Sequence, residues 1–145
     1  MCLVCLFSGS ALAEQIKTIY LNGEIQLSNG EKAVLAGLHL TEEGVTLLGA
    51  LIASKEVEVQ NEKDRSDSPL KPVYLSIKTQ ELDFPFFNKD EFKGKKVMVN
   101  ELLLAWGAAI VDEKAHFKKK GKYLEIQNQA RKKGEGLWSY ETLQT

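Results

Sequence analysis

The stretch AVLAGLHLTE, from Ala33 to Glu42, places a strand, a break and a helix start next to one another. Its first four residues are apolar, which is typical of a strand buried on both faces. Gly37 interrupts the run, and Thr41 has a side chain that caps helix N-termini. Acidic residues fill the next turn, where the helix dipole favours negative charge, and apolar residues recur at helical spacing as far as Ile52. The stretch therefore predicts a strand that leads almost directly into an amphipathic helix.

Two Asn-Gly pairs precede this stretch, at residues 22–23 and 29–30. Asn-Gly is the strongest short hairpin signal because both residues tolerate a positive φ. Between the pairs, Ile25 and Leu27 alternate with polar residues, as in a strand with one buried face. We therefore expect residues 16–38 to form a three-stranded meander.

The remainder of the chain predicts two more strands and two more helices. Asn100 is a candidate N-cap for the first of these helices, and Gly107 ends it. Gly134 stops the second helix, which is long and basic. The expected elements are strands around residues 57–59 and 73–77 and helices over residues 101–106 and 117–133. Strands and helices do not alternate regularly, so the fold class is α+β, and the order suits a closed five-stranded β-barrel with three helices packed on it.

The composition is that of an ordinary globular protein. The chain has 145 residues, of which 43% are hydrophobic and 27% are charged, which gives room for one domain with one core. Lys and Arg number 19 and Asp and Glu number 20, for a net charge of −1. These values exclude a disordered chain, a collagen-like repeat and a disulfide-rich miniprotein. They also argue against a protein that binds nucleic acid through an overall basic charge, although they leave room for a local basic face.

The first residues read MCLVCLFSGSALA and carry no charge. An apolar run that ends in Ala11-Leu12-Ala13 resembles the second half of a secretory signal peptide, and we expect its true start upstream of Met1 because the usual basic segment is missing. Cleavage after Ala13 would remove both cysteines and leave a domain over residues 14–145. That domain would be exported, periplasmic or secreted, without an integral membrane segment, because the apolar run is far shorter than a membrane crossing requires. The alternative is a buried N-terminal strand or helix.

Four stretches, taken together and in order, resemble the thermonuclease family, whose members have the staphylococcal-nuclease-like fold. Each stretch alone is a weak signal, but the ordered set covers nearly all of residues 16–139. The resemblance implies an OB-fold, with a five-stranded β-barrel and three helices. The stretches are Asn22-Gly23-Glu24, which stands at the family's Asp-Gly-Asp turn; Ala33–Glu42, which is similar to its V-R-L-A-G-I-D-A-P-E strand and loop; Val99–Ala109, which is similar to its V-N-E-x-L helix and trailing G-x-A; and Ala130–Trp138, which matches its basic last helix and closing G-x-W.

The resemblance also implies calcium-dependent hydrolysis of phosphodiester bonds in DNA and RNA. Glu24 and His39 stand at the positions of the family's two metal-binding carboxylates, but His39 offers a nitrogen atom, which Ca²⁺ does not favour. Glu42, or Glu43 if the alignment shifts by one residue, stands at the carboxylate that orients the attacking water. Glu24, His39 and Glu42 would suit zinc or manganese instead. The alternative is that His39 is an ordinary surface histidine. If the protein is active, we expect it to need Ca²⁺ or another divalent metal.

The two arginines that clamp the phosphate in the family have no counterpart here. The first falls on Val34, which offers nothing to a phosphate, and the second falls on Ser68. Lys32 lies two residues from Val34 on the same strand face and is a conceivable substitute, as is Lys71 if the loop is realigned. Losing one such donor typically costs about a hundred- to a thousandfold in rate. The sequence therefore predicts a nuclease fold without efficient nuclease activity, a pseudo-nuclease.

Basic residues concentrate near the C-terminal end. Residues 90–135 contain 11 Lys and Arg against 7 Asp and Glu, so this segment carries +4 and the rest −5. One interpretation is a patch that binds nucleic acid or another polyanion, and the other is a solvated helix face. The candidate binding lysines are Lys118, Lys119, Lys120 and Lys122, with Lys32 and Lys71 from the barrel.

Three functions remain open at this point. The first is a non-catalytic binding module for nucleic acid, another polyanion or a protein. The second is a metal-dependent phosphodiesterase with an altered site. The third is an interaction protein of the cell envelope that uses the aromatic loop Phe84–Phe92, whose phenylalanines could equally fill the barrel end. We expect the chain to be a monomer in each case.

Overall fold

A computed structural model describes residues 12–53, 55–62, 70–78 and 96–139. Five strands close a barrel in which β3 pairs in parallel with β6 and every other neighbouring pair is antiparallel. This closure joins segments that lie far apart in the sequence, since Ala33 pairs with Lys71. The barrel strands are β1 (Leu12–Ile19), β2 (Ile25–Leu27), β3 (Lys32–Leu35), β5 (Glu56–Asn61) and β6 (Lys71–Lys78).

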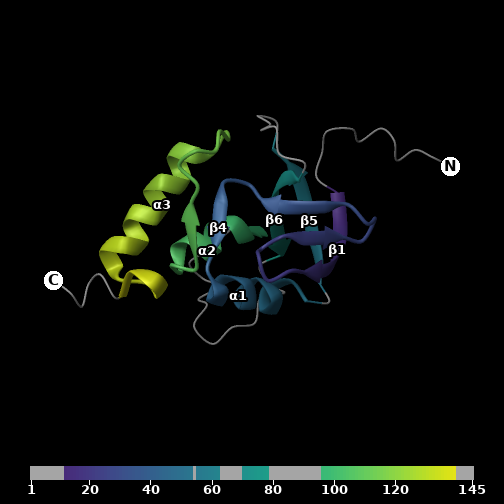
Figure 1. Ribbon diagram of the computed structural model, residues 1–145, viewed down its shortest axis with the longest axis horizontal. Coiled ribbons are helices and arrows are strands. Elements are labelled where there is room, and N and C mark those ends of the chain that lie inside the picture. The colour runs from purple at the N-terminus through teal and green to yellow at the C-terminus, as the bar shows by residue number, and fades with distance from the viewer. Residues whose placement is uncertain (1–11, 54, 63–69, 79–95, 140–145) are drawn as a thin grey trace.

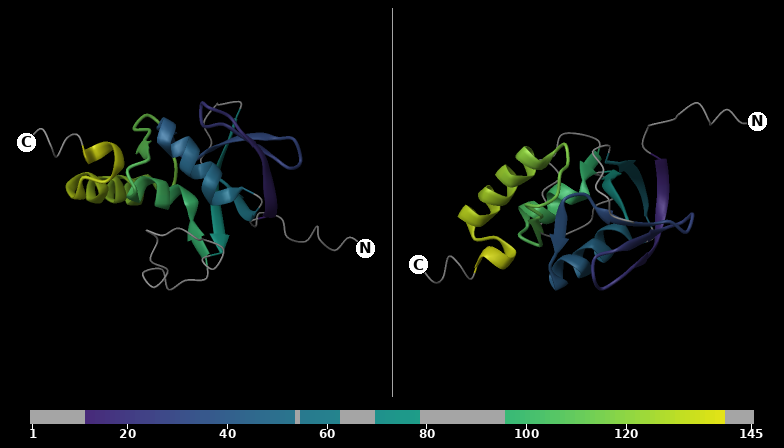
Figure 2. Two further views of the ribbon diagram at one scale, coloured as in Figure 1. Left: turned by 90° about the horizontal axis from the view of Figure 1, so that it is seen from below. Right: turned by 45° about the horizontal axis from the view of Figure 1, so that its top comes forward.

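Three short strands and three α-helices complete the domain. Strand β7 extends the sheet beyond β6, while β4 and β8 form a separate two-stranded ladder. Helix α1 lies against the barrel, and α3 lies beyond α2 and β8, on the side away from β1 (Figures 1 and 2). These elements are β4 (Leu38–Leu40), α1 (Glu42–Ile52), β7 (Lys96–Met98), α2 (Val99–Ala105), β8 (Ala109–Val111), α3 (Lys120–Lys133) and the 3₁₀ turn η4 (Gly136–Trp138). The predicted α+β fold, a five-stranded barrel with three helices, is confirmed.

The predicted meander is present but begins and ends earlier than expected, because it runs from Leu12 to Leu35 instead of over residues 16–38. Strands β1, β2 and β3 pair consecutively, and both Asn-Gly glycines have a positive φ, +91° at Gly23 and +92° at Gly30. Leu38, the last residue of the predicted meander, does not belong to it, because residues 38–40 leave the barrel as β4 and pair with β8. The four-residue apolar run is also less enclosed than predicted, since Val34 is only half-buried.

The start of α1 follows the sequence prediction. Thr41 Oγ1 accepts a hydrogen bond from the Gly44 backbone N–H at 2.9 Å, and Glu42 and Glu43 occupy the first turn. The same hydroxyl donates to the Ala108 carbonyl at 3.1 Å, which ties the helix start to the segment before β8. Gly44 lies so close to that carbonyl that a Cβ atom there would be 2.1 Å from the oxygen. This glycine therefore permits the close approach of α1 to residue 108.

The prediction that Asn100 caps α2 is wrong. Helix α2 begins at Val99, so Asn100 lies inside it, and its side chain is fully buried. The amide instead crosses to β6, where Oδ1 accepts from the Leu75 N–H at 3.0 Å and Nδ2 donates to the Val73 carbonyl at 3.2 Å. Buried backbone N–H and carbonyl groups need hydrogen-bond partners. The Asn100 amide supplies one to the Leu75 N–H and one to the Val73 carbonyl.

The last helix begins three residues later than predicted and ends where expected. Residues 117–119 precede α3, and Gly134 ends it in the left-handed conformation with φ +69°. Gly107 and Gly136 then allow the ends of α2 and α3 to touch, since a Cβ on Gly107 would lie 2.1 Å from the Glu135 carbonyl oxygen.

The N-terminal prediction concerns residues 1–13, most of which lie outside the described residues. Strand β1 begins at Leu12, and Ala13 pairs with Glu58 of β5. No helix in the described part of the chain is long and apolar enough to cross a membrane.

Candidate functional site

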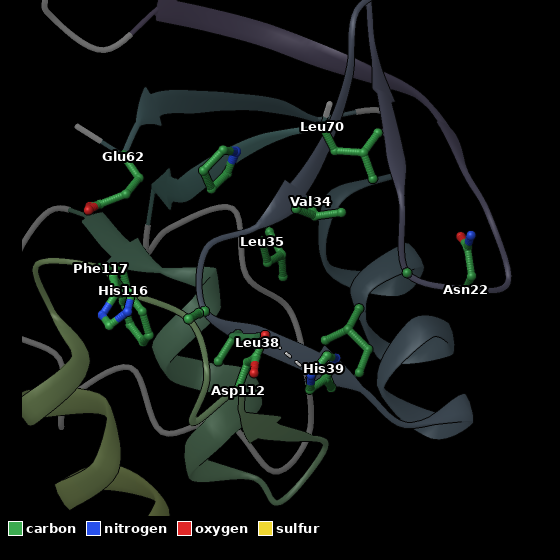
Figure 3. A pocket seen from close by; sticks show the side chains of 15 residues that line it. Asn22, Val34, Leu35, Leu38, His39, Glu62, Leu70, Asp112, His116 and Phe117 are labelled. Carbon is green, nitrogen blue, oxygen red and sulfur yellow. Dashed lines mark ion pairs between the residues drawn. The ribbon is translucent and has the colours of Figure 1, made fainter. Parts of the chain in front are cut away.

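A pocket of about 290 Å³ opens between the barrel and the segment that follows β8. Val34 and Leu35 line it from barrel strand β3, Leu38 lines it from β4, and Phe117 lies across from them (Figure 3). The chain can turn beneath Phe117 because residue 37 is glycine: a Cβ there would lie 2.2 Å from the ring, and φ is +70°. The pocket therefore has largely aliphatic and aromatic walls.

The polar side chains of this pocket are acids, histidines and one amide. His39 Nε2 lies 3.4 Å from Asp112 Oδ2, a contact that joins β4 to the end of β8 and is an ion pair when the imidazole is protonated (Figure 3). Glu62 and His116 line the side away from Asn22 (Figure 3). No Lys or Arg lines the pocket among the described residues. This part of the lining therefore offers no permanent positive charge to a phosphate group.

The structure does not bring the three predicted metal ligands together. His39 lines the pocket, whereas Glu24 and Glu42 do not. Glu24 closes a local turn instead, in which its Oε2 accepts from Asn22 Nδ2 at 2.9 Å. Glu42 and Glu43 are exposed on the first turn of α1. Within the described ranges, no three His, Cys, Asp or Glu side chains form a group that could hold a metal ion.

The two lysines considered as substitutes for arginine also point elsewhere. The Lys71 ammonium donates to Glu31 in an exposed ion pair, and hydrogen bonds from Lys71 and Asn29 hold the pKa of Glu31 below its ordinary value. The Lys32 ammonium lies 5.3 Å from the centre of the Tyr20 ring. Neither lysine lines the pocket beside Val34.

Comparison with known proteins places this architecture in a family. Residues 40–140 match the family model described as staphylococcal nuclease homologue. The chain belongs to this family. A search of curated proteins gives no match. The family resemblance and the OB-fold barrel inferred from four sequence stretches are thus confirmed. In this nuclease homologue, Val34 and His39, which stand where the resemblance expects a phosphate-clamping arginine and a metal carboxylate, line the same pocket.

A second hollow, of about 390 Å³, lies between the end of β5, the start of β6 and the start of α3. Three of the six predicted binding lysines line it, while Lys32, Lys71 and Lys120 do not, and we call it the lysine cleft. The Lys120 ammonium instead donates hydrogen bonds to the Glu113 and Ala115 carbonyls, in the segment before α3. The residues of the lysine cleft are Gln60, Asn61, Glu62, Tyr74, Lys118, Lys119, Gly121 and Lys122.

Glu62 is a site residue that the sequence reasoning missed. Its side chain is only 7% exposed and lines both the pocket and the lysine cleft. Oε1 accepts from the Tyr74 hydroxyl at 2.6 Å, and Oε2 accepts from the Lys118 backbone N–H at 2.9 Å. No sequence signal announces this role, because the alternation of Val57 and Val59 predicts that Asn61 points inward and Glu62 outward.

Two predicted features lie outside the described residues. They are Ser68, at the second arginine position, and the aromatic loop Phe84–Phe92. The binding of a protein through that loop therefore stays a prediction.

Proposed function

We propose that this staphylococcal nuclease homologue is a non-catalytic binding domain for nucleic acid or another polyanion. One observation carries the proposal: the pocket formed around Val34 and His39 is lined by no Lys or Arg among the described residues. Cleavage of a phosphodiester needs positive charge where negative charge develops in the transition state. The lysines instead gather on the other side of Glu62, in the lysine cleft.

The expected loss of activity is large. A bidentate arginine is replaced by an aliphatic side chain at Val34, and each missing donor of this kind costs about a hundred- to a thousandfold in rate. His39 is also the one predicted metal ligand in the pocket, since Glu24 and Glu42 do not line it. Lys71 and Lys32 would have to leave Glu31 and Tyr20 to compensate.

A fluorogenic DNase and RNase assay with calcium, manganese or zinc tests the loss of activity. We expect no turnover above the protein-free rate with any of the three metals. Metal-dependent turnover that disappears in Glu42→Gln or in Glu43→Gln, but persists in the exposed control Glu56→Gln, would instead support an altered phosphodiesterase.

We further propose that the domain is exported after cleavage behind Ala13. The mature chain would keep Glu14 and Gln15, which pair with Val57 and Glu56 of β5, so the barrel would retain part of this ladder. Mass spectrometry of the exported protein should give an N-terminus at Glu14. Recovery in the cytoplasm with residues 1–13 still attached would contradict the proposal.

A further inference from the structure

We propose that the lysine cleft binds the phosphate groups of a polyanion and recognises charge rather than base identity. This inference rests on the proposed binding function and names the site and the ligand chemistry. The cleft is concave, it has a volume of about 390 Å³, and three lysines from one short segment line it. Positive charges gathered in a hollow raise the local concentration of an anionic ligand.

The ammonium groups of the cleft are available to an anion. Among the described residues, no carboxylate pairs with Lys118 or Lys119. Lys122 pairs with Glu101 at 3.2 Å, but its side chain remains 60% exposed, so this ion pair is weak in water. The cleft can therefore present three positive charges to one ligand.

A hydrogen bond between the Glu62 carboxylate and the Lys118 backbone N–H holds the start of the lysine segment in place. Glu62 is buried at the base of the cleft, where its oxygens accept hydrogen bonds from the Tyr74 hydroxyl and the Lys118 N–H. These bonds anchor the start of the lysine segment to β5 and β6. Each carboxylate oxygen thus accepts a hydrogen bond from a donor within the protein.

The cleft lacks a surface on which a base could stack. Tyr74 is the one aromatic side chain among its described lining residues, and it is only 4% exposed. Its hydroxyl donates to Glu62, and the Lys119 ammonium lies 5.8 Å from the ring centre. Gln60 and Asn61 add amide groups, which commonly bind phosphate oxygens. We therefore expect binding that depends on phosphate charge and hardly on sequence.

Fluorescence anisotropy with the full chain and labelled single-stranded DNA tests the site. The variant removes the three cleft charges by Lys118→Gln, Lys119→Gln and Lys122→Gln. The matched control removes three exposed charges elsewhere by Lys17→Gln, Lys132→Gln and Lys133→Gln. We expect the cleft variant to lose about tenfold or more in affinity and to reduce the salt slope by about 2, since each phosphate contact contributes about 0.7. The control should lose far less.

The outcomes separate this inference from the proposed function. Equal losses in the two variants, with both melting as the wild type does, would overturn the lysine cleft and leave polyanion binding intact. Absence of binding by the wild type would overturn both. Poly-dT and a mixed sequence should bind alike, and inorganic polyphosphate should compete with either. A strong preference for one sequence, or no competition by polyphosphate, would contradict recognition by phosphate charge.

Discussion

Tyr123 lies at the centre of the contacts between α3 and the rest of the molecule. Its side chain is fully buried, its ring packs against Tyr74 and Phe117, and its hydroxyl donates to Met98 Sδ at 2.8 Å. Burial raises the pKa of the Tyr123 hydroxyl above its ordinary value of 10.0, and the negative charge of Glu101 adds to this effect.

This pKa shift predicts a loss of stability in alkali. Above about pH 10 the unfolded chain releases the Tyr123 proton while the folded chain keeps it, so the free energy of unfolding falls by about 1.4 kcal/mol per pH unit from this group. Tyr123→Phe should therefore lose less stability than the wild type as pH rises above 10. Urea unfolding at several pH values measures the difference, and the two proteins should have parallel profiles between pH 7 and 9. Parallel profiles above pH 10 as well would contradict the prediction.

The sequence predicted individual site residues only where the chain aligns with the family. Val34 could be placed at an arginine position from the pattern of residues 33–42 alone, and it does line the pocket. The partner of Lys71 could not be predicted, because the parallel pairing of β3 and β6 brings Glu31 to it from a distant part of the chain. Glu62 was missed for a similar reason, since its carboxylate is held by the Tyr74 hydroxyl and the Lys118 backbone N–H, which come from other parts of the chain.

At the scale of elements, the junction between α1 and the segment before β8 depends on the size of one residue. Gly44→Ala should lower the free energy of unfolding by about 2–4 kcal/mol, because the new Cβ would clash with the Ala108 carbonyl. Gly49→Ala in the same helix is the matched control: its Cβ would meet only Ile19 Cδ1, at 3.8 Å. The control should gain about 0.5–1 kcal/mol from helix propensity. Equal effects in denaturant unfolding would contradict this account of the junction.

Elements with strong local signals were predicted well, and those defined by distant contacts were not. Thr41 and Gly134 mark helix ends by chemistry that acts within one turn, and both ends were found where expected. The strands β4, β7 and β8 have three residues each, like β2, but no Asn-Gly pairs flank them, and they exist because other segments pair with them. Asn100 was wrongly predicted to be a helix N-cap, because an asparagine amide is equally suited to the buried hydrogen bonds that it makes with the backbone of β6.

At the scale of the whole molecule, a net charge of −1 conceals an uneven distribution. The segment 90–135 carries +4 and the remainder −5, and α3, which belongs to the basic segment, lies away from β1 (Figure 1). The pocket of the nuclease fold lies between these parts and is lined by acids, histidines and apolar side chains among the described residues. A polyanion should therefore bind at the start of α3 without entering the pocket.

The most direct test of this account follows the anisotropy of an end-labelled single-stranded DNA after addition of the protein and Ca²⁺. Binding raises the anisotropy, whereas cleavage into short labelled fragments lowers it below the value of the free DNA. We predict a rise to a plateau that remains constant with time and is reversed by salt. A fall below the free-DNA value that EDTA prevents would show that the nuclease reaction survives and would contradict the central claim.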